Sequence, residues 1–312
     1  MIVSRRSEAL SAPGLAGGGQ GPLHLSPPAD ALPMPYAEGV EHRFVAVNGA
    51  RLHYAGAGRG DPLVLLHGWP QHWWAWREVI PALARDYRVI CPDIRGFGWS
   101  EGGTDYGLEQ LAADLVGLLD VLGISQARVV GHDWGSEVAY HACLNWPGRF
   151  SHYVAIGGIT PSSTGVAVPR LPLRAWQMYA LALLGTYATT RLGVPESALH
   201  TWRHAGRFTP EEMQTYLGPL RRPVSAEATR RLYRHAVFHE LPQYVRSNRA
   251  TPLQVPTLHL HGERDPLTGG SLRGPHRGAA DTRFELVRGC GRFVAEEKPT
   301  ELTDRLSLFL AP

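Results

Sequence analysis

The run Gly131–Gly135 reads Gly-His-Asp-Trp-Gly and lies between a short apolar stretch and a helical pattern. The stretch Ala127–Val130 predicts a buried strand, and a helix is expected from Gly135 to about Asn145. The glycines suit a turn so tight that larger side chains would clash, with a strained central residue. Asp133, at the helix N-terminus, is therefore a candidate nucleophile that could attack an sp³ carbon and form an ester. The alternative is an aspartate that only caps the helix.

Strand and helix patterns alternate along most of the chain, which predicts a mostly parallel sheet flanked by helices. The first two strands are joined by Asn48-Gly49, a strong hairpin signal. The expected strands are Arg43–Val47, Arg51–Ala55, Pro62–Leu66, Arg88–Pro92, Ala127–Val130, His152–Gly157, Val255–His261 and Arg283–Val287. The expected helices around them are Trp73–Arg85, Gly107–Leu122, Gly135–Asn145 and Thr300–Phe309.

The alternation stops between residues 160 and 250, where only helical patterns occur. We interpret this segment as a helical lid inserted into an α/β core of residues 40–159 and 251–312, because the strand pattern resumes after it. A second independent domain is the alternative. Residues 1–39 are rich in Gly, Pro and Ser and are predicted to be a flexible leader. The helices expected in the lid are Leu173–Leu184, Pro210–Leu217, Ala226–Val237 and Leu241–Asn248.

Composition limits the class of protein. The net charge is only +3 over 312 residues, so neither nucleic acid nor a membrane is expected as a partner. The best candidate for a span, Arg174–Arg191, encloses 16 uncharged residues, fewer than the ~20 that crossing requires. The three scattered cysteines and the lack of a signal-peptide pattern favour a cytoplasmic protein. We expect no cofactor and no metal, and either a monomer or a homodimer.

The segment His67–Pro70 follows the buried strand Pro62–Leu66, which is where an oxyanion loop would lie. Backbone N–H groups of Trp69 and Trp134 are the candidate donors to a developing negative charge. His67 belongs to the same predicted pocket, although a structural hydrogen-bonding role suits it better.

Three runs carry a family resemblance: Leu66–His72, Cys91–Ser100 and Gly131–Gly135. Together they resemble bacterial epoxide-hydrolase-like α/β-hydrolases, beside the haloalkane dehalogenases, over about residues 41–312. The resemblance implies the α/β-hydrolase fold, with Asp133 as nucleophile and Asp265 as the carboxylate that orients a catalytic histidine. It further implies two lid tyrosines that donate to an epoxide oxygen.

The sequence Leu232-Tyr233-Arg234 is similar to the second of these tyrosine sites, and Gln177-Met178-Tyr179 is a weaker match to the first. A phenol suits this task because it stays neutral at pH 7 and can donate to a developing alkoxide. The alternative is that Tyr179 and Tyr233 only pack inside the lid.

Residues 289–299 match the family's Gly-His-Phe…Glu-Glu-x-Pro signature, except that Arg292 occupies the histidine position. A carboxylate can open an epoxide without a base, but hydrolysis of the resulting ester needs one, and this help is worth about 10²–10⁴-fold. Arginine cannot supply it at neutral pH. Arg292 is expected to pair with Asp265 and to hold Asp133 ionised, so that an alkyl-enzyme would accumulate.

The sequence therefore predicts an epoxide-hydrolase-like enzyme for an apolar small molecule, with impaired hydrolysis. Another histidine could still supply the base, and His259, His261 and His276 are close in sequence. The site could instead catalyse a non-hydrolytic cyclisation, rearrangement or addition in natural-product biosynthesis. Two alternatives remain. One is haloalkane dehalogenation, with the indoles of Trp69 and Trp134 binding the halide. The other is binding of a small molecule without turnover.

Overall fold

The computed structural model describes residues 25–27, 31–158, 176–242, 253–268 and 281–311. Eight strands form one sheet in the order β1-β2-β4-β3-β5-β6-β7-β8. β1 and β2 are antiparallel across the turn at Asn48, β2 is antiparallel to β4, and all other neighbours are parallel. This confirms the predicted fold class. The strands are β1 Glu41–Val47, β2 Ala50–Ala57, β3 Asp61–Leu66, β4 Tyr87–Pro92, β5 Ala127–His132, β6 Phe150–Ile156, β7 Thr257–Gly262 and β8 Thr282–Val287.

The strand order places the candidate site. The chain runs from β3 to β4 on one side and then crosses to β5 on the other side of β3. Ligands of open α/β sheets bind beyond the carboxyl ends of the strands where the order reverses in this way. The loop after β3 and the turn after β5 therefore meet at this point, with Leu66 paired to Gly131.

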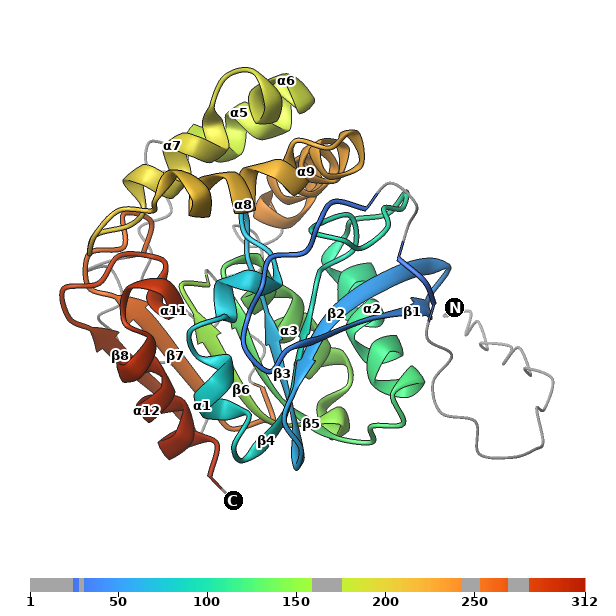
Figure 1. Ribbon diagram of the computed structural model, residues 1–312, viewed down its shortest axis with the longest axis vertical. Helices are drawn as coiled ribbons and strands as arrows, with labels where there is room; N and C mark the ends of the chain where they lie inside the picture. The colour runs from blue at the N-terminus through green and yellow to red at the C-terminus, as the bar shows by residue number, and fades with distance from the viewer. Residues whose placement is uncertain (1–24, 28–30, 159–175, 243–252, 269–280, 312) are drawn as a thin grey trace, which may run out of the picture.

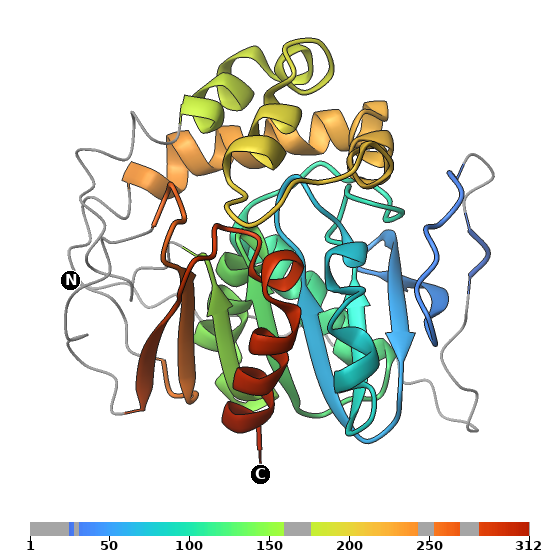
Figure 2. The same cartoon turned by 60° about the vertical axis from the view of Figure 1, so that its left-hand side comes forward.

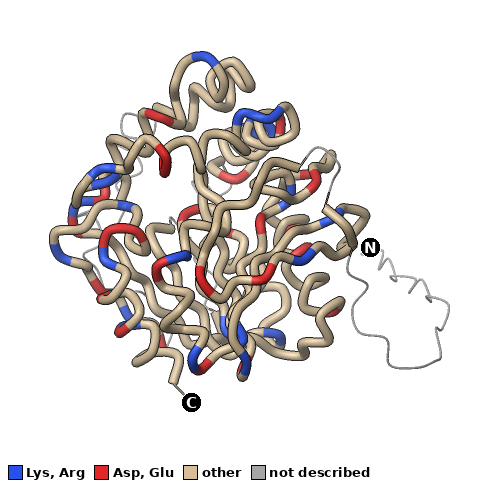
Figure 3. Tube along the Cα trace, viewed as in Figure 1, with Lys and Arg blue, Asp and Glu red and all other residues tan. Residues whose placement is uncertain are grey.

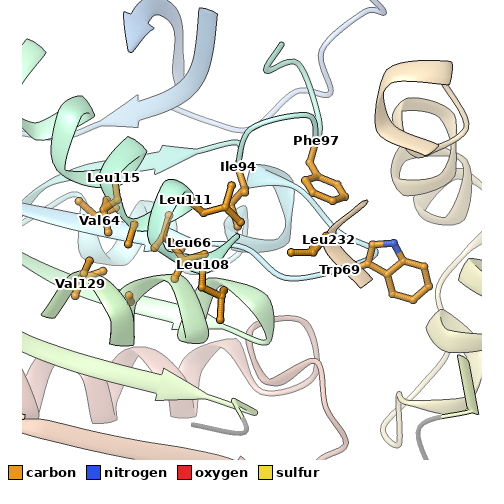
Figure 4. Packing of buried hydrophobic residues seen from close by; sticks show 14 of the residues in the cluster. Val64, Leu66, Trp69, Ile94, Phe97, Leu108, Leu111, Leu115, Val129 and Leu232 are labelled. Carbon is orange, nitrogen blue, oxygen red and sulfur yellow. The ribbon is translucent and has the colours of Figure 1, made fainter. Parts of the chain in front are cut away.

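Both faces of the sheet are buried, as the continuous apolar sequence of β3 requires. Val64 and Leu66 pack with helix α2 (Leu108–Val121) in one cluster, which Figure 4 shows. Leu63 and Leu65 point to the other face, where helix α12 (Pro299–Phe309) packs. The remaining helices of the core are α1 Ile80–Leu83, α3 Trp134–Asn145 and α11 Val294–Glu297, with short 3₁₀ turns η1 Trp73–Trp76 and η2 Pro147–Arg149.

The helices between β6 and β7 form a separate layer over the carboxyl ends of the parallel strands (Figures 1 and 2). We call residues 176–242 the helical layer. Its second-longest helix, α8, begins with a complete capping box between Thr209 and Glu212. The layer consists of α5 Trp176–Leu184, α6 Thr186–Thr190, α7 Val194–Thr201, α8 Pro210–Leu220, α9 Pro223–His235 and the π-helical turn η4 Ala236–Glu240.

Two local expectations differ from the structure. The helix expected over Trp73–Arg85 is divided into η1 and the short α1, because Pro81 lacks the N–H that a continuous helix would need. Helices α6 and α7 were not expected, since Gly185 and Gly193, both with positive φ, interrupt the apolar pattern before each of them. The first residues of the predicted helix Leu173–Leu184 lie outside the described residues, and so do the last residues of the predicted helix Leu241–Asn248.

Acidic and basic residues are interspersed along the chain, and neither sign covers the side shown in Figure 3. In the described part of the chain, no helix has the length and apolar character needed to cross a membrane. The described part of the predicted leader runs along the core, where the carbonyl oxygen of Leu32 accepts a hydrogen bond from the Trp99 indole at 2.7 Å.

The burial of the core predicts that two leucines contribute very differently to the free energy of unfolding. Leu65 is fully buried in β3, whereas Leu308 on α12 is 79% exposed. Leu65→Ala should lower the free energy of unfolding by about 2–5 kcal/mol, because it leaves a cavity. Leu308→Ala should change it by less than about 0.5 kcal/mol. Urea denaturation measures both, and equal losses would contradict this packing.

Candidate active site

Asp133 lies at the tip of the turn between β5 and α3, with φ of 52° and ψ of −118°. This is an uncommon conformation for a residue with a side chain. Gly131 and Gly135 allow the turn, because a Cβ at the first would clash with the Gly135 carbonyl and one at the second with the Leu66 carbonyl. The backbone thus presents the Asp133 carboxylate above the end of the sheet.

The loop after β3 holds one oxygen of this carboxylate. The backbone N–H of Trp69 donates to Asp133 Oδ2 at 3.0 Å, and the backbone N–H of Trp134 also donates to the carboxylate. Gly68 is required beside it, because a Cβ there would overlap the Asp133 side chain. These two N–H groups are the donors that the sequence proposes for an oxyanion hole.

Arg292 holds the other oxygen. Its Nη2 donates to Asp133 Oδ1, and its Nη1 donates to Asp265 Oδ2 at 2.9 Å. The guanidinium therefore lies between the two carboxylates, and only 2% of the residue is exposed. Position 292, for which the resemblance described above implies a histidine, is thus filled by a buried cation that contacts both acids.

The charges in this cluster favour the ionised forms of Asp133 and Arg292. Burial alone would raise the pKa of Asp133, but the charge of Arg292, assisted by His132 and by hydrogen bonds, lowers it below its ordinary value. Burial alone would lower the pKa of Arg292, but Asp265 and Asp133 raise it above the usual arginine value. Asp133 is therefore ionised and Arg292 charged near neutral pH, and neither group accepts or releases a proton there.

Asp265 is fixed by the loop after β7. Its Oδ1 accepts from the backbone N–H of Leu267 at 2.9 Å, and its Oδ2 accepts from the Thr268 hydroxyl. Since that hydroxyl proton is committed to Asp265, Thr268 Oγ1 accepts from His261 Nδ1 at 3.0 Å. Thr268 is not among the predicted site residues, because a single threonine two residues beyond Pro266 carries no motif.

The histidines near the site contact it through other groups. His132 Nε2 donates to the carbonyl oxygen of Arg292 at 3.0 Å, and burial lowers the pKa of His132 to about 4. His67 Nδ1 donates to the Gly68 carbonyl and its Nε2 accepts from the Ile94 N–H, both at 3.0 Å, so His67 ties two loops together. His259 stacks on Phe284 with 4.3 Å between ring centroids. His276 lies outside the described residues.

Tyr233, on α9, lies near enough to Asp133 to be affected by its charge. Its ring makes edge contacts with Trp69 and Trp134, each at 5.4 Å between centroids. Burial raises the pKa of Tyr233 well above 10, the negative charge of Asp133 raises it further, and a hydrogen bond with the Trp134 side chain opposes the shift. Tyr179, on α5, is half-buried, and no hydrogen bond or ring contact described for it reaches Asp133, Arg292 or Tyr233.

Two further residues fasten the Arg292 loop to the helical layer. The Arg292 N–H donates to the Trp202 carbonyl at 2.8 Å, and the guanidinium carbon lies 5.5 Å from the Trp202 ring. The Glu297 carboxylate accepts from four backbone N–H groups, two on each side of this boundary. They belong to His204 and Ala205 in the layer and to Gly291 and Phe293 in the loop.

Replacement of Arg292 by methionine tests the charge balance. Loss of one partner from a buried ion pair costs about 3–5 kcal/mol. In the unaltered protein the pKa of Asp133 lies below its ordinary 3.8. The ionised carboxylate therefore contributes to the free energy of unfolding above that pH, and this contribution is lost only as the pH falls through the folded-state pKa. Without Arg292 burial raises this pKa, so the variant should recover stability as the pH falls from 8 to 5.

Urea denaturation at the two pH values measures the difference between the proteins. Arg264→Met is the matched control, because its side chain is 64% exposed and its removal should cost less than about 0.5 kcal/mol. A deficit in Arg292→Met that stays constant between pH 8 and pH 5 would contradict the charge assignment.

Comparison with known proteins agrees with this architecture. Residues 61–299 match the family described as alpha/beta hydrolase fold. The soluble epoxide hydrolase of Corynebacterium sp. (strain C12) is 33% identical over 303 residues, covering 88% of this chain and 98% of that protein. The AB hydrolase superfamily protein YfhM of Bacillus subtilis (strain 168) is 33% identical over 279 residues, covering 84% and 95%. The solved structure of the epoxide hydrolase CorEH without ligand has a TM-score of 0.75 at 28% identity, covering 88% and 99%. The chain therefore belongs to the α/β-hydrolase fold family, in its epoxide-hydrolase-like branch.

Proposed function

We propose that this enzyme acts on an apolar, epoxide-type small molecule, with Asp133 as the nucleophile and with hydrolysis of the alkyl-enzyme impaired by Arg292. The observation that carries the proposal is the position of the Asp133 carboxylate, held by two backbone N–H groups and facing Tyr233. The aromatic side chains of Trp69, Trp134 and Tyr233 around it suit an apolar substrate.

In the first step Asp133 Oδ1 attacks an epoxide carbon, the carbon–oxygen bond of the ring breaks, and its electron pair moves onto the oxygen. Tyr233 donates its proton to that oxygen. The raised pKa of Tyr233 keeps the phenol neutral, and the Trp134 indole can donate to the phenol oxygen, which leaves the phenol proton for the substrate. The product is an ester between Asp133 and the ring-opened substrate.

The second step would be attack of water on the ester carbon. The oxyanion would form on Oδ2, to which the Trp69 N–H already donates, and the Trp134 N–H also donates to this carboxylate. Water must also lose a proton, and Arg292 cannot accept it because its pKa is raised above the usual arginine value. The absent base is worth about 10²–10⁴-fold, so the ester should persist.

A second candidate follows from the hydrogen bond between Arg292 and Asp133 Oδ1. The same contact that neutralises the carboxylate occupies the attacking oxygen. Arg292 and Tyr233 would then act as donors in a non-hydrolytic rearrangement, cyclisation or addition, with Asp133 providing electrostatic stabilisation.

The free, buried cysteines Cys91 and Cys143 support the cytoplasmic location that we propose with either chemistry.

If the ester persists, a covalent adduct is expected on the protein. After incubation with styrene oxide, intact-protein mass spectrometry should show one added substrate mass, located on the peptide that contains Asp133. Asp133→Asn should remain unmodified. Rapid formation of the diol by the unaltered protein, without an adduct, would overturn the proposed block at the second step.

Restoration of the missing base gives the complementary prediction. Arg292→His should raise the rate of diol formation by at least about 100-fold, because the imidazole can then deprotonate water. Arg292→Lys serves as the control, since it keeps a cation and supplies no base at neutral pH. If Arg292→His is inactive on epoxides, haloalkanes and esters, the non-hydrolytic or binding function is favoured. Halide release without diol formation would favour dehalogenation, for which the buried Trp69 indole N–H, without a partner among the described residues, is the available donor.

A further inference from the structure

Two segments far apart in the sequence hold opposite oxygens of the Asp133 carboxylate. The loop after β3 supplies the Trp69 N–H to Oδ2, and the segment just before α11 supplies the Arg292 guanidinium to Oδ1. Helix α11 packs against η1, which continues the loop after β3. The direction in which the carboxylate points therefore depends on how these two segments are placed relative to each other.

A hydrogen bond between two side chains joins the segments directly. Gln71, two residues beyond Trp69, donates from Nε2 to Glu296 Oε1 at 3.2 Å. Glu296 lies in α11, four residues beyond Arg292. Gln71 and Glu296 are both buried, so this hydrogen bond is stronger than it would be in water.

Gln71 is also fixed to the peptide that contacts Asp133. Its backbone N–H donates to the carbonyl oxygen of Gly68 at 3.0 Å. That carbonyl belongs to the same planar peptide unit as the Trp69 N–H, which donates to Asp133. A displacement of Gln71 would therefore displace this peptide, and the side chain of Gln71 ties the peptide to Glu296.

The Glu296 carboxylate is held by two further donors. Its Oε1 accepts from the Tyr216 hydroxyl of α8, and its Oε2 lies 2.9 Å from Nη1 of Arg77, the residue that follows η1. The Gln71 amide also forms a hydrogen bond with the Tyr216 hydroxyl. Three donors from different segments leave the carboxylate little freedom to move, so it can act as a fixed partner for Gln71.

We propose that Gln71 and Glu296 are a pair of positioning residues for Asp133. Their hydrogen bond keeps the Trp69 N–H and the Arg292 guanidinium at the spacing that orients the carboxylate. Neither member of the pair contacts the carboxylate itself in a described hydrogen bond, so both act through the two groups that do. The effect on catalysis rests on the proposed function, whereas the effect on the Trp69 N–H can be measured without substrate.

The competing explanation is that Glu296 only fastens the helical layer to the core. In that case the loss of any donor to its carboxylate would have a similar effect. Tyr216→Phe removes one such donor but keeps the hydrogen bond between Gln71 and Glu296. Gln71→Met removes that hydrogen bond with a side chain of similar length. Comparison of these two variants therefore separates positioning from fastening.

The backbone amide of Trp69 provides the measurement. The chain contains two Gly-Trp pairs, at positions 68–69 and 98–99. Carbon-13 in the glycine carbonyls and nitrogen-15 in the tryptophans therefore select two backbone amides in a nuclear magnetic resonance spectrum. Trp99 donates to the Asp93 carboxylate at 3.0 Å, so it is an internal reference of the same kind. Trp69→Phe assigns the signals, because one of them disappears.

In Gln71→Met the Trp69 amide proton should move upfield, because its hydrogen bond to Asp133 lengthens, while the Trp99 signal stays in place. Glu296→Met should give the same shift, and the double variant should give no larger one, since all three break one link. Glu296→Gln should leave the signal near its original position, because its amide oxygen can still accept from Gln71. Tyr216→Phe should also leave it there.

The rate of adduct formation tests the consequence for the proposed reaction. At saturating styrene oxide, Gln71→Met should form the Asp133 adduct at least about tenfold more slowly, because a small misplacement of a reacting group can cost about 10²-fold. The concentration that gives half the maximal rate should change little, since the aromatic side chains around Asp133 are unaltered. Tyr216→Phe is the control and should react at a rate close to that of the unaltered protein.

An unchanged Trp69 signal in Gln71→Met would overturn the proposal. Equal shifts in Gln71→Met and Tyr216→Phe would do the same, because they would indicate a general loss of packing. If Glu296→Met does not fold, Gln71→Met and Glu296→Gln decide the question. The expected shifts without any adduct in the unaltered protein would contradict the proposed function but support the positioning pair.

Discussion

The side chain of Arg292 lies between Asp133 and Asp265, and the rest of the site is arranged around this buried cation. Each buried ion costs several kcal/mol in lost hydration, which only good pairing and additional hydrogen bonds can offset. The additional donors are present: backbone N–H groups serve Asp133, and the Leu267 N–H and the Thr268 hydroxyl serve Asp265. The turn after β5 and the loop after β7 are therefore linked electrostatically, and Asp133 is held as a carboxylate.

In the function that we propose, Arg292 impairs the hydrolytic step while the α/β-hydrolase fold is retained. A histidine at position 292 could cycle between neutral and charged forms, whereas the guanidinium stays charged throughout. In the same proposal, Asp133, Tyr233 and the Trp69 N–H are suited to opening a strained ring and stabilising an oxyanion, while, among the described residues, none of the hydrogen bonds found for Asp133 comes from a histidine. Such a site favours either a persistent covalent ester or a reaction in which water does not have to lose a proton.

Much of the fold follows from short-range patterns in the sequence. The glycines around Asp133 predict the tight turn because no other residue fits there, and the apolar run of β3 predicts a strand buried on both faces. These expectations and the family resemblance are confirmed. The site residues Asp133, Asp265, Arg292, Tyr233, Trp69 and Trp134 lie together, although their catalytic roles remain predictions. Tyr179 makes no described contact with them.

The remaining features depend on contacts between distant segments. No local pattern indicates the hydroxyl of Thr268, the carbonyl of Trp202 or the pairing of Arg77 with the distant Glu212 and Glu296. Any threonine, any carbonyl or any arginine would look the same in the sequence. The helix expected over Trp73–Arg85 follows from apolar periodicity alone. This periodicity does not take account of the break that Pro81 introduces, although Pro81 is a local signal for it. Long-range pairing of this kind becomes visible only in three dimensions.

The carboxylate of Glu297 has a consequence for attempts to exchange parts between relatives. It accepts N–H groups from His204 and Ala205 on one side and from Gly291 and Phe293 on the other, so two segments almost ninety positions apart behave as one rigid corner. In a chimera that carries the helices of another hydrolase, these hydrogen bonds would be lost unless the segment around position 292 is taken from the same hydrolase. Transplantation of new substrate preferences onto this scaffold should therefore treat both pieces as a single cassette.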